Sequence, residues 1–329
     1  MKKIIGNILK VTVPFLFGGG ILFYTYRDFD FTKAWSVLSD GMNYWWMALT
    51  LVFGVLSHVI RGLRWKLTLA PLGENPKMSN CVYAVFISYA ANIVIPRIGE
   101  ISRCGILKKY DGVSFSKSLG TVVTERLVDT LCVGLITGMT LLMQANVFGV
   151  FFDKTGTNLS VFAARFTSVE TYIFLASILG ILVLVVLLLR KLAVFGKVAG
   201  IMKNIWLGIM SLKSVKHKWL FVLSTAGIWL CYFLQFYLAF FCFGFSQHLG
   251  ILSGLVLFVV GSIAVVVPTP NGAGPWHFAV ITMMTLYGVS RVDAGIFALL
   301  VHGIQTFLII VLGIYGLAVL PFTNKNKRV

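Results

Sequence analysis

The sequence predicts an all-α polytopic membrane protein, from its composition, its recurring long apolar segments and two apolar runs that end at proline. Of the 329 residues, 58% are hydrophobic and 12% are charged, and the mean hydropathy is +0.90. Soluble domains carry about 25% charged residues, so the apolar excess must face lipid. No stretch resembles a separate soluble domain. We therefore expect one integral membrane domain, residues 1–329, with six to eight transmembrane helices.

Six segments are apolar over about the 20 residues that a helix needs to cross a bilayer. They are 9–26, 44–60, 118–143, 170–189, 219–243 and 295–320. The first follows Met1-Lys2-Lys3, a start typical of signal sequences. No Ala-x-Ala cleavage site follows it, so we expect an uncleaved first span.

Two further apolar runs are interrupted by proline. Residues 81–95 precede Pro96, and residues 251–267 precede Pro268. A run of about 15 residues suits a re-entrant hairpin as well as a span. The distribution of charge decides between these two interpretations.

The net charge of +17 would be typical of a nucleic-acid-binding protein, but the apolar content excludes that class and leaves the charge as a topology signal. With a cytoplasmic N-terminus and a re-entrant 81–96, 22 basic residues face the cytoplasm, five face outward and Arg126 lies within a span. This asymmetry follows the positive-inside rule. A cytoplasmic C-terminus then requires 251–288 to begin and end outside, as a second hairpin or as two short spans.

The proline-ended runs belong to a predicted internal repeat. Residues 86–96 align without gaps to 258–268, and Gly-Val-Ser recurs at 112–114 and 288–290 before a long apolar span. The predicted units are 81–143 and 251–320, and the charge argument gives them opposite orientations. Inverted repeats with broken helices are typical of transporters, whose substrate site lies near the midplane. Chance similarity between apolar segments is the alternative.

A polar region, 190–218, separates the two units. Its apolar residues recur at nearly helical spacing among lysines, which predicts a cytoplasmic amphipathic linker helix on the anionic leaflet surface. A solvated linker is the alternative.

The first candidate site follows Pro96. If a helix resumes there, Arg97, Glu100 and Arg103 share one face. Two guanidiniums around one carboxylate leave a positive charge suited to a phosphate. The alternative is that the arginines only orient the chain in the membrane, with Glu100 as their surface partner.

A second group, Glu125, Arg126 and Asp129, lies inside the 118–143 span. Ionisable residues at that depth are costly unless they pair or line a wet cavity. Arg126 and Asp129 can pair at i,i+3, and Asp129 can also stabilise an arginine from 97–103. A purely structural ion-pair network remains the alternative to substrate binding.

The second proline-ended run leads into Pro-Thr-Pro-Asn-Gly-Ala-Gly-Pro-Trp-His, 268–277. Irregular backbone at membrane depth is tolerated only inside protein or around water. Asn271 and His277 are therefore candidate substrate-binding residues. His302 and Gln305 align with Arg126 and Asp129.

Other features favour structural roles. Arg61, Arg64, Trp65 and Lys66 close the second span, and we interpret them as interfacial anchors rather than a head-group site. The five cysteines are scattered without CxxC spacing. Walker, HExxH and GxSxG motifs are absent from the sequence. We accordingly expect no catalytic residues, no cofactor and no metal site.

The elements P-x-x-G-E-x-x-R (96–103) and E-R-x-x-D (125–129), with PTPNGAG at 268–274, carry a family resemblance. The chain resembles the lysylphosphatidylglycerol synthase transmembrane region, or flippase-like domain family, over most of its length. The resemblance implies a polytopic inner-membrane protein that translocates or binds a lipid with a polar head group. Some relatives add a soluble aminoacyl transferase, which we do not expect in this chain. His277 stands where the resemblance implies a glutamate.

We expect a lipid translocase of the inner membrane with both termini cytoplasmic and with membrane lipids as its partners. Arg97, Arg103 and Arg126 would engage an anionic head group, while Glu100, Glu125 and Asp129 orient the arginines or exchange a proton. A membrane-embedded transferase acting on a phospholipid or polyprenyl phosphate is the alternative. A third possibility is a scaffold for envelope-biosynthesis enzymes.

Overall fold

A computed structural model gives the fold of residues 2–27, 29–144 and 195–324, with a few single positions between 169 and 180. Over these residues every regular element is helical, and Met42 and Phe243 form an isolated β-bridge. Four helical segments are long and apolar enough to cross a membrane: Tyr44–Leu72, Phe115–Met143, Lys218–Cys242 and Arg291–Thr323. The chain is an all-α integral membrane protein.

The helices follow one another along the chain with short connections. They are α1 (Lys2–Tyr26), α2 (Phe31–Ser36), η1 (Val37–Gly41), α3 (Tyr44–Leu69), η2 (Ala70–Leu72), α4 (Met78–Val94), α5 (Ile98–Asp111), α6 (Phe115–Met143), α10 (Phe195–Met210), η3 (Ser211–Ser214), α11 (Lys218–Tyr237), η4 (Leu238–Cys242), α12 (Ile251–Ala264), η5 (Pro270–Gly272), α13 (Pro275–Leu286) and α14 (Arg291–Thr323).

Four of the six predicted spans fall on the four long apolar segments: 44–60 in α3, 118–143 in α6, 219–243 in α11 with η4, and 295–320 in α14. The segment 9–26 lies within α1. The predicted span 170–189 lies outside the residues that the structure describes, apart from single positions. The total number of spans stays a prediction.

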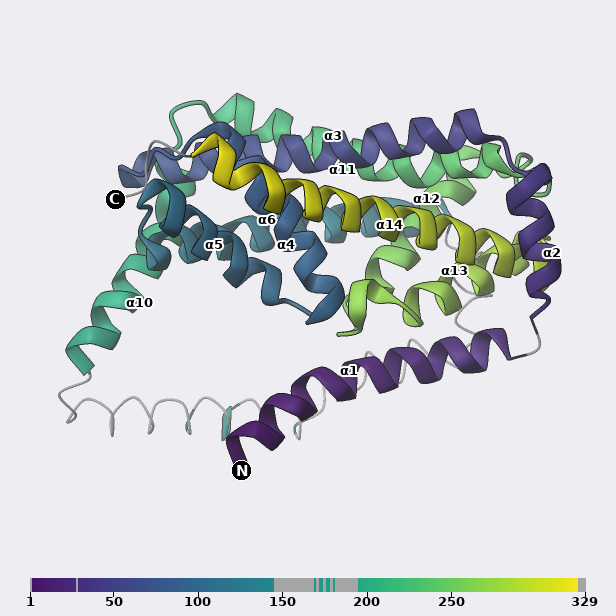
Figure 1. The fold of residues 1–329 in the computed structure, drawn as a ribbon, viewed down its shortest axis with the longest axis horizontal. Helices are drawn as coiled ribbons and strands as arrows, with labels where there is room; N and C mark the ends of the chain where they lie inside the picture. The colour runs from purple at the N-terminus through teal and green to yellow at the C-terminus, as the bar shows by residue number, and fades with distance from the viewer. Residues whose placement is uncertain are drawn as a thin grey trace.

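The long helices define two ends of the molecule. Helices α3 and α11 pack side by side and run antiparallel along one edge of the bundle (Figure 1). At one end the Asn43 amide donates to the Cys242 carbonyl at 2.8 Å, and we call this the Met42 end. At the other, the Lys117 side chain near the start of α6 donates to the Leu72 carbonyl at 3.0 Å, and we call this the Leu72 end.

Helices α4 and α5 form a hairpin that begins and ends at the Leu72 end. The Asn80 side chain at the start of α4 donates to Asp111 at the end of α5, at 2.8 Å. At the tip, Pro96 cannot continue the backbone hydrogen bonds of α4, and Arg97 adopts a left-handed conformation with φ 66°. The Gly99 amide then donates to the Asn92 side chain at 2.8 Å, which caps the first turn of α5.

Helices α12 and α13 form a second hairpin that begins and ends at the Met42 end. Its tip contains η5, and Asn271 there has φ 50°. Helix α4 contacts η5, so the two hairpin tips meet in the middle of the molecule (Figure 1). Helix α14 crosses both tips, because Gly313 packs against Ala90 and Thr306 accepts a hydrogen bond from Asn271 at 2.8 Å.

The connection after each hairpin has the same local structure. Gly112 and Gly288 both have positive φ, 72° and 85°. Val113 and Val289 are both buried, and the following serine directly precedes a long helix, α6 or α14. The order hairpin, Gly-Val-Ser, long helix thus occurs twice, from opposite ends. The division into repeat units 81–143 and 251–320 remains a prediction that this parallel favours.

The described part of the predicted linker, 190–218, contains α10, which packs closely on α6. Gly120 and Gly208 lie in direct backbone contact, and Thr124 donates to the Gly208 carbonyl at 3.1 Å. Trp206 on α10 is 59% exposed. One face of this helix is therefore fixed by packing within the protein, while its predicted contact with the leaflet surface stays a prediction.

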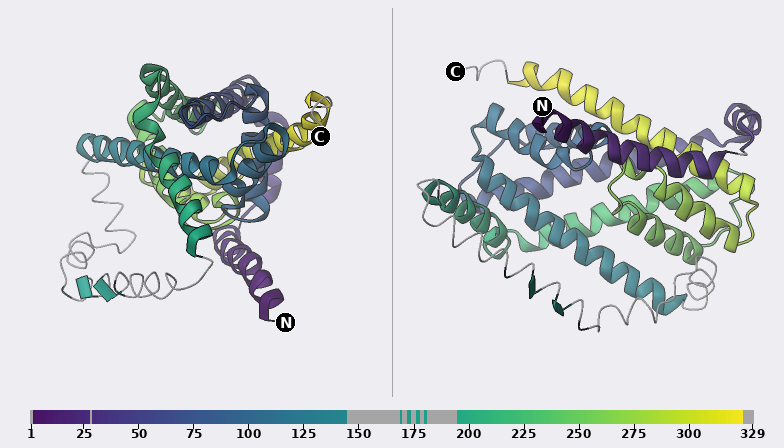
Figure 2. Two further views of the ribbon diagram at one scale, coloured as in Figure 1. Left: turned by 90° about the vertical axis from the view of Figure 1, so that its left-hand side faces the viewer. Right: turned by 90° about the horizontal axis from the view of Figure 1, so that it is seen from below.

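Helix α1 is attached at one region only. Its residue Gly18 packs against Thr269 and Ala273 at the tip of the second hairpin. The N-terminal part of α1 projects away from the other helices in the left view of Figure 2. This contact leaves the C-terminal end of α1 beside α13 and α14.

Candidate functional site

One face of α3 carries two buried arginines. Arg61 is 2% exposed and Arg64 is 0% exposed, and three residues of helix separate them by about one turn. Trp65 beside them is also 0% exposed and donates its indole N–H to Thr121 on α6 at 3.0 Å. A buried charge is strongly destabilising unless a partner is close, so this face requires carboxylates opposite.

Helix α6 supplies these carboxylates from Glu125 and Asp129, which share a face at i,i+4. Asp129 accepts from Arg61 Nη1 at 2.7 Å and from Arg64 Nη2 at 2.8 Å. Arg64 Nε also lies 3.5 Å from Glu125 Oε1. Asp129 therefore binds two guanidiniums at once and joins α3 to the middle of α6.

The first hairpin completes the group through Glu100 and Arg103 on α5. Arg103 Nη2 lies 2.9 Å from Glu125 Oε2, and its guanidinium lies 4.6 Å from the ring centre of Trp65. Glu100 pairs with Arg126 Nη2 at 3.3 Å, and Arg126 also lies 3.7 Å from Asp129. Helices α3, α5 and α6 thus meet through charged side chains alone.

We call these seven residues the charge network. They are Arg61, Arg64, Glu100, Arg103, Glu125, Arg126 and Asp129. Four guanidiniums meet three carboxylates, which leaves one positive charge in excess. The side chain of Arg126 is 41% exposed, so the excess charge is accessible from the edge of the network. Asp129 lies 14 residues into α6, about 21 Å from its start at 1.5 Å per residue.

The charge network has unused hydrogen-bond donors. Within the described residues, the Nε atoms of Arg61, Arg103 and Arg126 are buried and donate no hydrogen bond. Unsatisfied buried donors are uncommon and call for a ligand, a water or a functional explanation. An anion with several acceptor oxygens has the chemistry that these donors lack.

Aromatic residues of α4 and α11 border the charge network. The hydroxyl groups of Tyr89 and Tyr232 lie 2.8 Å apart, and the Arg61 guanidinium lies 5.9 and 5.7 Å from their ring centres. His58 is 5% exposed and lies 4.3 Å from Tyr89 between ring centres. These rings stabilise the Arg61 cation on the side away from Asp129.

A second, uncharged cluster lies at the tip of the second hairpin. The Asn271 carbonyl lies 3.1 Å from His302 Nε2, and the His277 and His302 rings are 4.6 Å apart between centres. His277 is 3% exposed. Gln305 Nε2 is buried and has no partner among the described residues. This second cluster occupies the place on α14 that corresponds to Arg126 and Asp129 on α6.

The eight predicted binding residues divide into three places. Five of them come together in the charge network: Glu100, Arg103, Glu125, Arg126 and Asp129. Asn271 and His277 belong to the second cluster. Arg97 is exposed at the hairpin tip, because its left-handed φ places it before the helix rather than on the face of Glu100 and Arg103. Their role in substrate binding stays a prediction.

The interpretation of Arg61, Arg64 and Trp65 as interfacial anchors was wrong, because all three are buried and face α6. Helix α3 continues to Leu69, well beyond the apolar segment 44–60, so these residues do not end the helix. A signal was present in the sequence. Arg61 and Arg64 have the helical spacing and the opposite charge that match Glu125 and Asp129 on another helix.

The helical spans and the buried charge network define an integral membrane protein with a polar site at depth. The family described as lysylphosphatidylglycerol synthase TM region matches residues 11–313, and the chain belongs to this family. This match contains every residue of the charge network and of the second cluster.

One similar curated protein is named glycosyltransferase AglD, from Haloferax volcanii. It is 28% identical over 122 residues, which make up 37% of this chain and 19% of that protein. The chain therefore matches less than a fifth of this relative's length. No solved structure matches this chain.

Proposed function

We propose that this protein is a flippase-like lipid transporter that binds a lipid with an anionic or zwitterionic head group and moves it across the inner membrane. The observation that carries the proposal is the charge network, in which four guanidiniums meet three carboxylates within a bundle of apolar helices. A phosphate offers the negative charge and the acceptor oxygens that this arrangement lacks. Membrane lipids are the proposed partners, and the protein itself changes no bond in them.

Arg126 is the residue that would meet the head group first. Its contacts to Glu100 and Asp129, 3.3 and 3.7 Å, are longer than the 2.7 and 2.8 Å contacts of Arg61 and Arg64 to Asp129. Its side chain is also more exposed than theirs. A phosphate can therefore replace Glu100 on Arg126 while the buried arginines keep their partners. The released Glu100 would then repel the lipid phosphate and favour its onward movement.

The two hairpins give the proposed path. We interpret them as re-entrant, entering from opposite membrane faces, with their tips meeting near the midplane. The first hairpin then holds the cytoplasmic half of the path and the second holds the outer half, where Asn271 and His277 would receive the head group. Exposed aromatic residues at both ends support this placement: Trp35 and Trp45 at the Met42 end, and Trp206 and Trp219 at the Leu72 end. Both termini lie in the cytoplasm in this topology.

A membrane-embedded transferase is the second candidate, and the name of the glycosyltransferase relative favours it. In that case Glu100 or Asp129 would act as acid or base on a lipid phosphate substrate. The two functions differ in their product. Translocation leaves the lipid chemically unchanged, whereas a transferase gives a lipid of altered mass.

The test is lipid movement in reconstituted vesicles, followed by chemical quenching of a head-group-labelled anionic lipid in the outer leaflet. The variant is Arg126→Gln, and the matched control is Lys117→Gln. Lys117 lies on the same helix, is also half-buried and pairs with Glu74 at 3.0 Å outside the charge network. We expect Arg126→Gln to slow movement at least tenfold and Lys117→Gln to leave it unchanged. Equal rates in all three proteins would contradict the proposal, and a lipid of changed mass would favour the transferase.

A further inference from the structure

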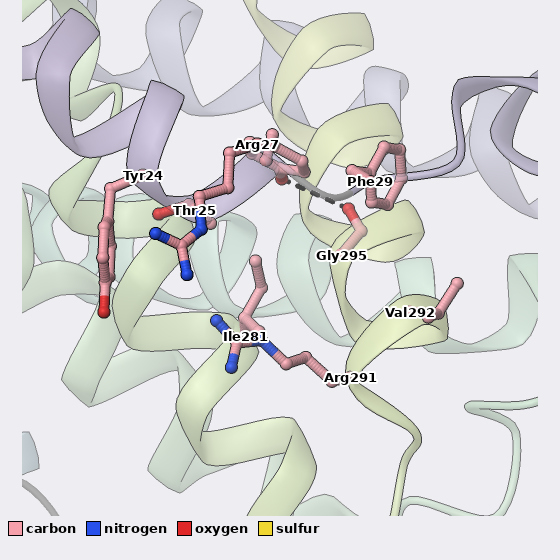
Figure 3. A pocket seen from close by; sticks show the side chains of 9 residues that line it. Tyr24, Thr25, Arg27, Phe29, Ile281, Arg291, Val292 and Gly295 are labelled. Carbon is pink, nitrogen blue, oxygen red and sulfur yellow. Dashed lines mark hydrogen bonds between the residues drawn. The ribbon is translucent and has the colours of Figure 1, made fainter.

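A separate cleft lies at the Met42 end, far along the chain from the charge network. It has a volume of about 300 Å³ and opens between the C-terminal end of α1, helix α13 and the first turn of α14. Figure 3 shows the Arg27 and Arg291 side chains extending into it from α1 and α14. Small-ligand sites have volumes of about 300–1,000 Å³, so this cleft accommodates a head group but not a large ligand.

The cleft is positively charged. Arg27 and Arg291 both line it, and the described residues of its lining include no carboxylate. The nearby carboxylate of Asp293 is already bound, by Lys33 Nζ at 2.8 Å and by the Ser290 hydroxyl at 2.7 Å. Two guanidiniums that extend into one small volume repel each other unless an anion lies between them.

The walls of the cleft are held in place without a ligand. The Tyr26 hydroxyl donates to the Gly295 carbonyl at 3.2 Å and joins α1 to α14. Gly295 packs so closely that a β-carbon there would lie 2.9 Å from the Phe29 ring. The two arginines therefore extend from elements whose separation is fixed, which lowers the entropy that binding would lose.

Beside the charges, the lining is apolar and aromatic. The Tyr24 ring lies 5.2 Å from the Arg27 guanidinium, and Phe29, Ile281 and Val292 complete this side. A free inorganic ion needs no apolar contacts, whereas a phosphate attached to acyl or prenyl chains does. The combination fits an amphiphilic phosphate.

We propose that this cleft is a second anion site, which binds the phosphate group of a membrane lipid through Arg27 and Arg291. The site does not depend on the transport function proposed above, because binding at this end requires no movement across the bilayer. If transport does occur, the cleft is where a head group at the Met42 end would be held.

The experiment measures lipid binding to the full chain in detergent by native mass spectrometry. The probes are phosphatidylglycerol, diacylglycerol as its counterpart without phosphate, and inorganic phosphate as competitor. The variants are Arg291→Gln, which removes one guanidinium, and Val292→Trp, which fills the cleft and keeps both arginines. The control is Lys33→Gln, which removes one positive charge at the same end but outside the cleft lining.

We expect phosphatidylglycerol to bind about tenfold more weakly to Arg291→Gln and to Val292→Trp, as for the loss of one charge-assisted hydrogen bond. Lys33→Gln should bind it as the unmodified protein does, and diacylglycerol binding should be the same in all variants. Competition by inorganic phosphate at similar concentrations would assign the site to the free ion. Equal weakening by Lys33→Gln and Arg291→Gln, or no weakening by either cleft variant, would overturn the proposal. Transport measured in parallel distinguishes failure of this site from failure of the charge network.

Discussion

Arg64 and Asp129 join α3 to α6 through a 2.8 Å ion pair at which Arg64 is completely buried. The same guanidinium donates to Thr225 on α11 at 3.3 Å and lies 3.5 Å from Glu125. One side chain therefore connects three helices that are far apart in the sequence. The proposed head-group site is consequently also part of the protein's framework, and variants must be chosen to separate these two roles.

Asp129→Asn should be strongly destabilising. It leaves Arg61 and Arg64 buried without the carboxylate that binds both, and breaking a buried pair in this way typically lowers the free energy of unfolding by about 3–5 kcal/mol. The matched control is Asp293→Asn, which breaks the partly exposed pair with Lys33 and should have an effect of at most about 1 kcal/mol. Thermal unfolding in detergent measures both. Similar melting temperatures for the two variants would show that the buried network does not stabilise the fold.

The ion pair between Arg103 and Glu125 should show strong coupling in a double-mutant cycle. Each single variant, Arg103→Met or Glu125→Gln, leaves its partner buried and short of an opposite charge. The double variant removes both charges, so it should be less destabilised than the sum of the singles, by about 1–3 kcal/mol. Unfolding free energies of the four proteins give the coupling directly. Additive effects would mean that the two residues act independently despite their 2.9 Å contact.

The tip of the first hairpin should not tolerate Gly99→Ala. A β-carbon there would overlap the Ser88 carbonyl oxygen and lie 2.8 Å from Asn92 Oδ1, which caps α5. Alanine normally stabilises a helix relative to glycine by about 1 kcal/mol, so the expected sign is reversed by the close packing. Gly105→Ala on the same helix is the control, because a β-carbon there meets nothing within 4 Å. We expect a lower melting temperature and reduced lipid movement for Gly99→Ala, and no loss of stability for Gly105→Ala.

The sequence predicted the membrane class, four of the long helices and five members of the charge network. These predictions depended on local information: apolar length for the spans, and ionisable residues inside or beside a span for Glu125, Asp129 and Arg103. The proline-ended runs likewise predicted where the two hairpin tips lie, because proline interrupts a helix wherever it occurs inside one.

The remaining part of the site depends on which helices are neighbours, and a single sequence does not contain that information. Arg61 and Arg64 resembled anchors because arginines often follow an apolar span, and only their contact with α6 shows otherwise. The hydroxyl pair of Tyr89 and Tyr232 joins residues 143 positions apart. The left-handed backbone of Arg97 was equally unforeseen, since that conformation is uncommon for any residue with a side chain.

The proposed re-entrant hairpins make a clear prediction about the sides of the membrane. Asn75 precedes the first hairpin and Lys109 lies near its end, and both are exposed at the Leu72 end. Asn75→Cys and Lys109→Cys should therefore react with a membrane-impermeant thiol reagent from the same side, the cytoplasm. His248→Cys and Val292→Cys flank the second hairpin at exposed positions and should both react from outside.

Labelling of intact cells and of inverted vesicles distinguishes the two sides. The native thiols interfere little, because Cys81, Cys104, Cys231 and Cys242 are buried, and Cys132 can be replaced by alanine. If 81–96 crossed the membrane fully, Asn75→Cys and Lys109→Cys would react from opposite sides. That outcome would also place the basic residues of α5 outside, against the positive-inside rule. Same-side labelling of each pair, from opposite faces for the two hairpins, is the pattern that only an inverted pair of re-entrant hairpins gives.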